Sequence, residues 1–267
     1  MFLRPDKSRL NYRDDGRRIS FDMEKTMKQI ITGIFLFLAA PFLFAGHHEG
    51  ESKPVYQFFH FSTLDEAAVV KAFDDFFVSD CGKEFPGNIA LAREFYNGSD
   101  TSTHFMIVGF KSHKDRVAGE MTSCPPFGKW VADMNAAGAL PWKSERLVQA
   151  VKEVKDWSQD TAFLKYDFNV APQDVEQFVG IWDELMASLT EDGLVTNSYG
   201  LEAVLAGSKD FTHFAYVGHT DRALLAEQSA KVTSSEAYKE YLAEAADLRT
   251  STNTTMVYIV KSWAGKN

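Results

Sequence analysis

Four residues of this chain are the best suited to moving protons, namely His60, His104, Asp167 and His213. Imidazole titrates near neutral pH, and a histidine or a carboxylate can accept a proton from a bound substrate. His104 and His213 stand at the same place in two near-identical stretches, residues 103–109 (THFMIVG) and 212–218 (THFAYVG). These four are therefore the catalytic candidates. The alternative is that they pair with one another or supply a hydrogen bond that the fold needs.

Alternation along two aromatic strands predicts which side chains could meet a ligand. Successive side chains of a strand point to opposite faces of its sheet. One set is consistently apolar and should pack under helices: Phe59, Phe61, Leu164, Tyr166 and Phe168. The other set combines aromatic and ionisable groups, which is typical of a small-molecule pocket. It comprises His60, Asp167 and four candidate ligand-binding residues, Tyr56, Phe58, Phe163 and Lys165.

Metal and cofactor signals are weak. The four candidate residues include types that bind zinc or iron, but no HExxH or CxxC motif accompanies them, and nothing marks an axial histidine for haem. Cleavage after Ala45 would leave Gly46-His47-His48 as a new N-terminus, a pattern that suits square-planar copper or nickel. His47 and His48 are otherwise part of a solvated linker. We expect no cofactor and no metal, with these two histidines as a minor option.

The first 53 residues predict export. Residues 1–22 are polar and aperiodic, as in an upstream extension from a misplaced start codon. Residues 23–45 contain Lys25 and Lys28 followed by an apolar run at 30–44, the pattern of a signal peptide. The apolar run is shorter than the roughly 20 residues of a spanning helix, so we expect cleavage rather than anchoring. Residues 46–53 form a linker, and the mature chain is expected in the periplasm or outside the cell, with no membrane span.

Two cysteines, Cys81 and Cys124, lie in the mature region. An oxidising compartment favours a disulfide between them, and closing such a loop is worth about 4 kcal/mol in the chain-entropy model. The alternative is two buried, unpaired thiols.

The mature chain contains an internal repeat, whose two copies are residues 54–157 and 158–267. Beyond THFxxVG, Phe127 and Trp130 fall on Tyr238 and Tyr241. Each copy predicts strand, helix, strand, strand, helix, strand. The first copy places strands at 55–61, 89–96, 103–110 and 146–155, and a Thr63–Glu66 capping box starts its first helix. In the second copy, strands are expected at 194–205, 211–219 and 254–262, besides the aromatic strand containing Phe163.

This element order is the ferredoxin-like βαββαβ unit, whose sheet carries helices on one face only. Two such units can cover each other sheet to sheet and close a barrel, so the predicted fold class is α+β, a pseudo-dimeric α+β barrel. In this element order and repeat, residues 55–263 resemble the dimeric α+β barrel superfamily, which includes the antibiotic-biosynthesis-monooxygenase-like and NIPSNAP-like proteins. The resemblance implies a cavity between the two sheets.

Three functions remain open. The first is a carrier or binding module for a small, partly apolar molecule. The second is a cofactor-independent monooxygenase-like enzyme or isomerase that uses the barrel cavity, and the third is a structural or interaction module. The net charge of -9 argues against a nucleic-acid partner. A monomer or a homodimer is expected.

Overall fold

The computed structural model describes residues 11–14, 17–20, 52–98, 100–120 and 124–266. Two units are distinguished, residues 1–51 and residues 52–267. In the first unit, β1 (Asn11–Asp14) pairs antiparallel with β2 (Arg17–Ser20). The signal peptide expected at 23–45 and the linker histidines His47 and His48 lie outside the described residues. Among the helices described, none is both long and apolar enough to cross a bilayer.

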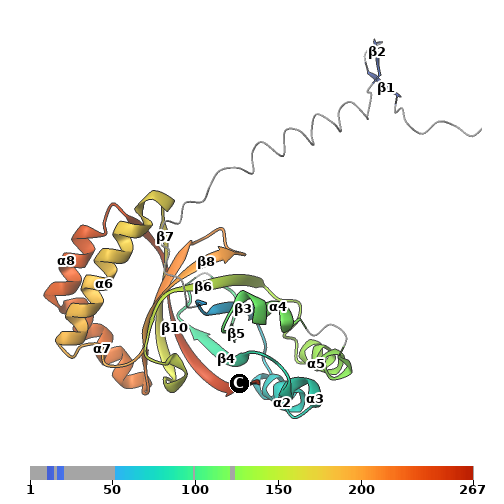
Figure 1. The fold of residues 1–267 in the computed structure, drawn as a ribbon, viewed down its shortest axis with the longest axis horizontal. Coiled ribbons are helices and arrows are strands. Elements are labelled where there is room, and N and C mark those ends of the chain that lie inside the picture. Colours follow the sequence, from blue (N-terminus) through green and yellow to red (C-terminus); the bar gives the residue numbers. More distant parts are fainter. Residues whose placement is uncertain (1–10, 15–16, 21–51, 99, 121–123, 267) are drawn as a thin grey trace, which may run out of the picture. The chain divides into compact units, whose positions relative to one another are not determined.

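The second unit is a closed barrel in which every neighbouring pair of strands runs antiparallel (Figure 1). The strand order is β10-β4-β5-β3-β6-β8-β9-β7. The strands are β3 (Val55–Phe61), β4 (Asn88–Phe95), β5 (His104–Phe110), β6 (Ser144–Val154), β7 (Ala162–Val170), β8 (Tyr199–Ala206), β9 (His213–His219) and β10 (Arg249–Trp263).

The barrel consists of two βαββαβ halves that are joined through their last strands. In each half the fourth strand lies beside the first, and it also pairs with the second strand of the other half: β6 with β8, and β10 with β4. These two strands are the longest in the barrel, because each must serve both halves. The predicted fold class is therefore confirmed.

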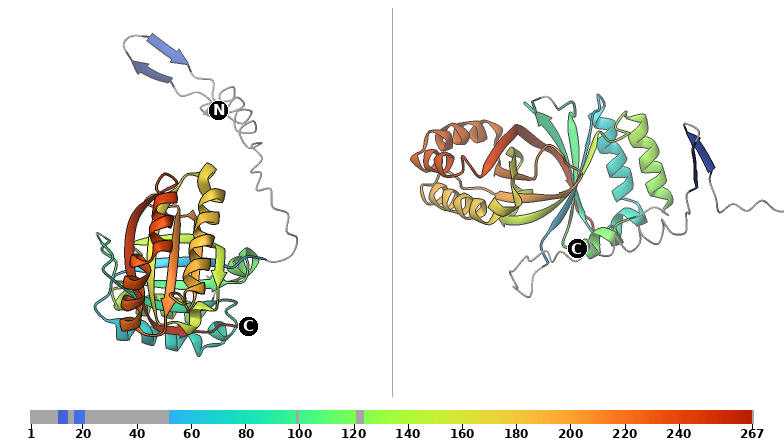
Figure 2. Two further views of the ribbon diagram at one scale, coloured as in Figure 1. Left: turned by 90° about the vertical axis from the view of Figure 1, so that its left-hand side faces the viewer. Right: turned by 90° about the horizontal axis from the view of Figure 1, so that it is seen from above.

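Helices cover the outside of each half. Figure 2 shows one group of helices on one side of the barrel and a second group on the opposite side. The first half has α2 (Glu66–Phe77), α3 (Asp80–Lys83), α4 (His113–Ala118) and α5 (Pro125–Ala136). The second half has α6 (Val175–Glu191), α7 (Arg222–Ser234) and α8 (Glu236–Glu244), and two 3-10 turns, η1 (Trp157–Gln159) and η2 (Pro172–Asp174), lie near the strand ends. The sequence did not predict α4 and α7.

Two aromatic-rich cores fill the space between helices and barrel. In the first half, Phe73 of α2 stacks on Trp263 at a centroid distance of 4.8 Å and also contacts Trp130 of α5. In the second half, Phe178 and Trp182 of α6 are fully buried against the sheet. Burying a side chain of this size stabilises the fold by about 1.5–3 kcal/mol. The protein's own side chains thus fill most of the space between the helices and the barrel.

The predicted disulfide is present. Cys81 of α3 is bonded to Cys124, whose Cα lies 6.5 Å away and which begins α5. The bond holds the short α3 against the start of α5.

The predicted capping box is wrong in detail. Asp65, not Thr63, caps α2, and its carboxylate accepts from the Ala68 N–H at 2.9 Å. The Thr63 hydroxyl instead accepts from the Asp65 N–H and donates to the Ala137 carbonyl at 2.7 Å. The helix therefore starts later than predicted, and Glu66 sits in its first turn with a side chain free to reach β5.

The glycines that end THFxxVG make room for aromatic rings inside the barrel. Gly109 lies opposite Tyr56 and Gly218 lies opposite Phe163 in the strand register. A Cβ at Gly109 would come within 3.1 Å of the Tyr56 ring, and one at Gly218 within 2.8 Å of the Phe163 ring. The motif therefore occurs in both halves because each half packs an aromatic ring of its first strand against the glycine that ends it.

Candidate functional site

Side chains divide between the two faces of the barrel wall as the alternation predicts. Phe61 packs under the helices of the first half, and Phe168 packs under those of the second. Tyr56, Phe58 and Phe163 face the interior. They meet further interior residues from the other strands, namely Phe105, Val148, Phe211, Phe214, Tyr216 and Val257.

A small cavity remains in this interior. Its volume is about 60 Å³, and its exposed lining is apolar. A water molecule needs about 10–15 Å³ of such volume, so the cavity has room for only a few water-sized groups. Lys165 contributes to the lining, and so do two acidic residues, Glu153 and Glu202.

A larger polar hollow of about 540 Å³ opens beside the cavity; we call it the His60 mouth. Its lining includes His60, Arg146, Lys165, Asp167 and Phe211. Lys165 lines both the hollow and the inner cavity. Two of the four catalytic candidates, His60 and Asp167, thus come together here.

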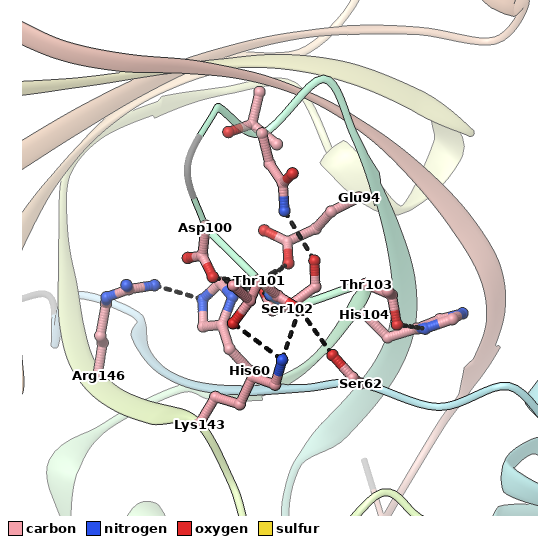
Figure 3. Close-up of polar contacts among 12 residues, drawn as sticks. His60, Ser62, Glu94, Asp100, Thr101, Ser102, Thr103, His104, Lys143 and Arg146 are labelled. Carbon is pink, nitrogen blue, oxygen red and sulfur yellow. Dashed lines mark hydrogen bonds and ion pairs between the residues drawn. The ribbon is translucent and has the colours of Figure 1, made fainter.

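The two ring nitrogens of His60 have different hydrogen-bond partners, and the ring is neutral. Arg146 donates from a terminal guanidinium nitrogen to His60 Nε2 at 2.5 Å (Figure 3). Because arginine cannot accept a hydrogen bond, Nε2 must carry the lone pair and Nδ1 the proton. Nδ1 faces Glu94 Oε2 at 3.4 Å. Burial lowers the pKa of His60, and the guanidinium lowers it further, so the ring is neutral at pH 7.

Glu94 is the carboxylate of this group. Burial opposes its ionisation, but the contact with His60 and the hydroxyl of Ser102 outweigh burial and lower the pKa of Glu94. Ser102 donates to Glu94 Oε2 and also lies 3.0 Å from Asp100 Oδ1. Since His60 is neutral, the carboxylate is held by neutral donors. The His60–Glu94 contact has the orientation of a base backed by a carboxylate.

Lys165 and Asp167 form a buried ion pair. The ammonium of Lys165 also lies over the rings of Phe211 and Phe214, at 4.8 and 5.0 Å from their centroids. Burial lowers the pKa of Lys165, and the charge of Asp167 opposes that shift. Lys165 and Asp167 thus pair with each other, as one alternative for these residues allowed.

Two cations that line the mouth, Arg146 and Lys143, have no carboxylate partner among the described residues, and Lys143 already donates to the carbonyl and hydroxyl of Thr101. Among the residues that the structure describes, none of the Arg146 nitrogens lies within ion-pair distance of an acidic side chain, and its Nε is buried without a hydrogen-bond partner. The guanidinium lies over the Phe211 ring at 5.0 Å. A guanidinium stacked on a ring and left without a carboxylate suits the oxygens of a carboxylate or phenolate.

The other two candidates, His104 and His213, lie on the helix side of the barrel wall. His104 Nε2 lies 2.9 Å from Glu66 Oε2, its Nδ1 lies 2.8 Å from the Thr103 hydroxyl, and its ring stacks on Phe61. Figure 3 shows the ring of His104 pointing away from the ring of His60. His213 Nδ1 lies 2.9 Å from its own preceding threonine, Thr212. Burial lowers the pKa of both histidines, and neither of them lines the His60 mouth with His60 and Asp167.

Sequence reasoning missed a second polar group in the interior, which we call the Glu202 cluster: Tyr56, Glu153, Trp157, Glu202 and Tyr216. The Tyr56 hydroxyl donates to Glu153 Oε1 at 2.7 Å and accepts from the Trp157 indole N–H at 3.3 Å. Both carboxyl oxygens of Glu202 and the hydroxyl of Tyr216 have no hydrogen-bond partner among the described residues. Only 2% of Glu202 is exposed.

Strand register could have revealed this cluster. Glu202 lies directly opposite Phe214, so the two share a face, and Tyr216 stands where the first copy has Ile107. An aromatic hydroxyl that replaces an aliphatic residue between two copies is a signal for an asymmetric site.

Burial sets the protonation of the Glu202 cluster. Burial, and then the neighbouring Glu153 carboxyl, raise the pKa of Glu202 well above its usual value. Burial also raises the pKa of Glu153, against the hydrogen bond from Tyr56. Two carboxyl groups in one poorly solvated site cannot both ionise easily. Burial and these acidic neighbours raise the pKa values of Tyr56 and Tyr216 as well, so both phenols stay neutral.

The described residues contain no group of three or more His, Cys, Asp or Glu side chains that could hold a metal ion. His47 and His48, the minor option, lie outside the described part of the chain.

No protein-family model matches the chain, and no curated protein matches it. Solved structures share its fold. Proteins from Fusobacterium nucleatum and Lactobacillus acidophilus, both described as "putative monooxygenase", superpose with TM-scores of 0.55 and 0.54 at 14% and 11% identity. The alignments cover 79% of this chain and 94% and 96% of those chains. An anthrone oxidase-like protein gives a TM-score of 0.54 at 14% identity over 80% of this chain and 94% of its own. At these identities the likeness shows the fold alone, a closed antiparallel barrel covered by helices.

Proposed function

We propose that the barrel binds a small, partly apolar molecule that carries an acidic oxygen group. The apolar part enters the aromatic interior beside Phe58 and Phe214, and the acidic group stays in the His60 mouth on Arg146. The mouth is large enough for such a group, whereas the inner cavity accepts only a short apolar end.

The observation that carries this proposal is the unpaired guanidinium of Arg146. A charged group that is partly removed from water is costly unless it is paired. Lys165 has Asp167, but Arg146 has only the neutral His60 and the face of Phe211. A ligand anion would complete the site.

Isothermal titration with small aromatic carboxylates, from benzoate to phenylpropanoate, tests the proposal. Arg146→Gln should weaken binding by roughly 10- to 100-fold, because it removes one charge-assisted hydrogen bond worth about 1.5–3 kcal/mol. Arg222→Gln is the matched control, because Arg222 also lies over an aromatic ring, that of Tyr258, but on an exposed helix. If no carboxylate binds, or if both variants bind alike, the proposal fails and the structural-module alternative gains, since aromatic side chains already fill much of the interior.

A second candidate is a cofactor-independent oxygenase or isomerase. The His60–Glu94 contact favours it, because a substrate anion that draws the Arg146 guanidinium away from Nε2 would free the lone pair of a neutral imidazole backed by a carboxylate at Nδ1, which can then accept a proton. Three solved structures with this fold are described as monooxygenases or as anthrone oxidase-like, which makes oxidisable aromatic compounds the first substrates to try.

Oxygen consumption with anthrones and simple hydroquinones tests this candidate. His60→Ala should lower turnover by roughly 10²- to 10⁴-fold, the usual contribution of a positioned base. Turnover that survives both His60→Ala and Asp167→Asn would remove these two residues from the mechanism.

We also propose that the two halves arose by tandem duplication and that the chain is exported. The shared element order and the repeated THFxxVG support the first point. The disulfide between Cys81 and Cys124 and the apolar run at 30–44 support the second. The N-terminal mass of the protein from an exporting host tests the signal peptide.

A further inference from the structure

We infer that the Glu202 cluster is a second subsite, which binds a small organic ammonium ion. It uses Glu202 and Glu153 in the interior cavity, whose lining also includes Phe58 and Phe214, beside which the proposed function places the apolar part of its ligand. Separate titrations and the variants Glu202→Gln and Arg146→Gln tell the two proposals apart.

The first argument is the unpartnered carboxyl of Glu202. It is almost completely buried, it lines the cavity, and no described residue donates to either of its oxygens. Glu153 lines the same cavity, accepts from the Tyr56 hydroxyl, and has Glu202 and Tyr216 as its other polar neighbours there; no cation pairs with it among the described residues. A ligand with several N–H donors and a positive charge would satisfy both carboxyl groups at once.

The second argument is the aromatic wall around these acids. Tyr56, Trp157, Phe163 and Tyr216 line the same cavity, and Trp157 meets Tyr56 edge to face at 6.3 Å. Aromatic faces around a carboxylate stabilise alkylammonium groups through cation–π attraction. A cavity of about 60 Å³ limits the ligand to a few non-hydrogen atoms.

The third argument is access. Tyr56 and Trp157 line the inner cavity and also an outer hollow of about 500 Å³. These two side chains are therefore the wall between the cluster and the surface, and rotation of the Trp157 ring would open a path. The ring of Tyr216 packs directly on Gly200, where a Cβ would come within 2.4 Å of it.

Binding must release a proton. In the free protein, burial and the neighbouring Glu153 raise the pKa of Glu202 and so favour its protonated form. The other ionisable groups that influence it are Glu153, the hydroxyls of Tyr56 and Tyr216, and the more distant Lys53, whose charge favours ionisation. An ammonium ion replaces the lost proton as the partner of the carboxylate.

The test is an NMR titration with ethylammonium chloride on protein labelled with ¹³C at the glutamate carboxyl carbons. We expect saturable shifts of the Trp157 indole signal, assigned with Trp157→Phe, with a dissociation constant in the millimolar range for so small a ligand. The Glu202 carboxyl signal should move to its ionised position in the same titration. Ethanol has a similar size and donates a hydrogen bond without charge, so it should leave the carboxyl signal in place.

Two variants separate the outcomes. Glu202→Gln keeps the shape and should weaken ethylammonium binding about 10-fold or more, while leaving carboxylate binding at the His60 mouth unchanged. Arg146→Gln should show the reverse pattern. Absence of saturable shifts in the wild type, or equal binding of ethylammonium by Glu202→Gln, overturns the ammonium subsite. The carboxylate titration, read separately, still decides the proposed function.

Discussion

Replacing Glu202 by glutamine should make the protein more stable at neutral pH. Most substitutions of a fully buried residue destabilise a protein. Here the wild-type carboxyl has no donor among the described residues and lies beside a second acid, Glu153. A glutamine amide has nearly the same shape and can donate to the Glu153 carboxylate. The change therefore removes the cost of ionising a buried carboxyl beside a second acid and keeps a donor toward Glu153.

The effect at neutral pH is the cost of ionising the buried carboxyl, and each tenfold by which the folded form holds this proton more tightly than the unfolded chain adds about 1.4 kcal/mol to that cost. For a folded unit of this size, each kcal/mol shifts the melting temperature by about 2–4 °C. The gain should depend on pH in a definite direction. The folded-state pKa of Glu202 is raised, so the folded form holds its proton more tightly than the unfolded chain does.

That group therefore contributes its full stability below the unfolded glutamate pKa, about 4.3, and loses it as pH rises through the folded pKa. Melting curves of wild type and Glu202→Gln at pH 4 to 8 should lie close together at pH 4 and separate as pH rises, with the variant higher. Glu184→Gln, on the exposed face of α6, is the matched control and should show no such divergence. A variant that is less stable than wild type at every pH would show that Glu202 has a stabilising partner, and the argument would be refuted.

Three further outcomes are expected. Gly200→Ala should lower stability by about 1–3 kcal/mol in melting experiments, because its Cβ would meet the Tyr216 ring at 2.4 Å; the same loss in Gly200→Ala/Tyr216→Ala would contradict that cause. Cys81→Ser should lower the free energy of unfolding by about 2–4 kcal/mol, and a wild type that is indifferent to reductant in denaturant titrations would speak against the disulfide. His104→Phe should leave carboxylate binding within a factor of about two, because His104 faces Glu66 and not the mouth; a large loss in titration calorimetry would place it in the site.

Much of the barrel could be predicted because two physical signals were strong. Period-two alternation separated Phe61 from Phe58, and both strands of each central pair were flanked by turn residues. The helix starts were harder. At α2 the chain offers Thr63 and Asp65 within three residues, and the tertiary bond from Thr63 to Ala137 decides between them. Amphipathic spacing also fails for α7, which buries only Leu225, so the sequence carries little sign of that helix.

The site could be predicted only in part. His60, Lys165 and Asp167 lie on first strands with clear alternation, and they meet at the mouth. His104 looked equivalent to them by residue type, but strand parity puts it on the helix side with Glu66. Arg146 reaches His60 because β6 pairs with β3, and Glu202 reaches Glu153 because β6 also pairs with β8 of the other half. That pairing depends on contacts far apart in the chain, and no local pattern records it.

The most direct test of the account is a crystal structure of the barrel with the small aromatic carboxylate that binds best. The account predicts that the carboxylate contacts the guanidinium of Arg146 in the His60 mouth and that the ring lies toward Phe58 and Phe214. The chain offers another hollow outside the barrel, of about 330 Å³, between the first sheet and its helices beside Phe73 and Trp130. A ligand found there, with Arg146 unchanged, would contradict the central claim.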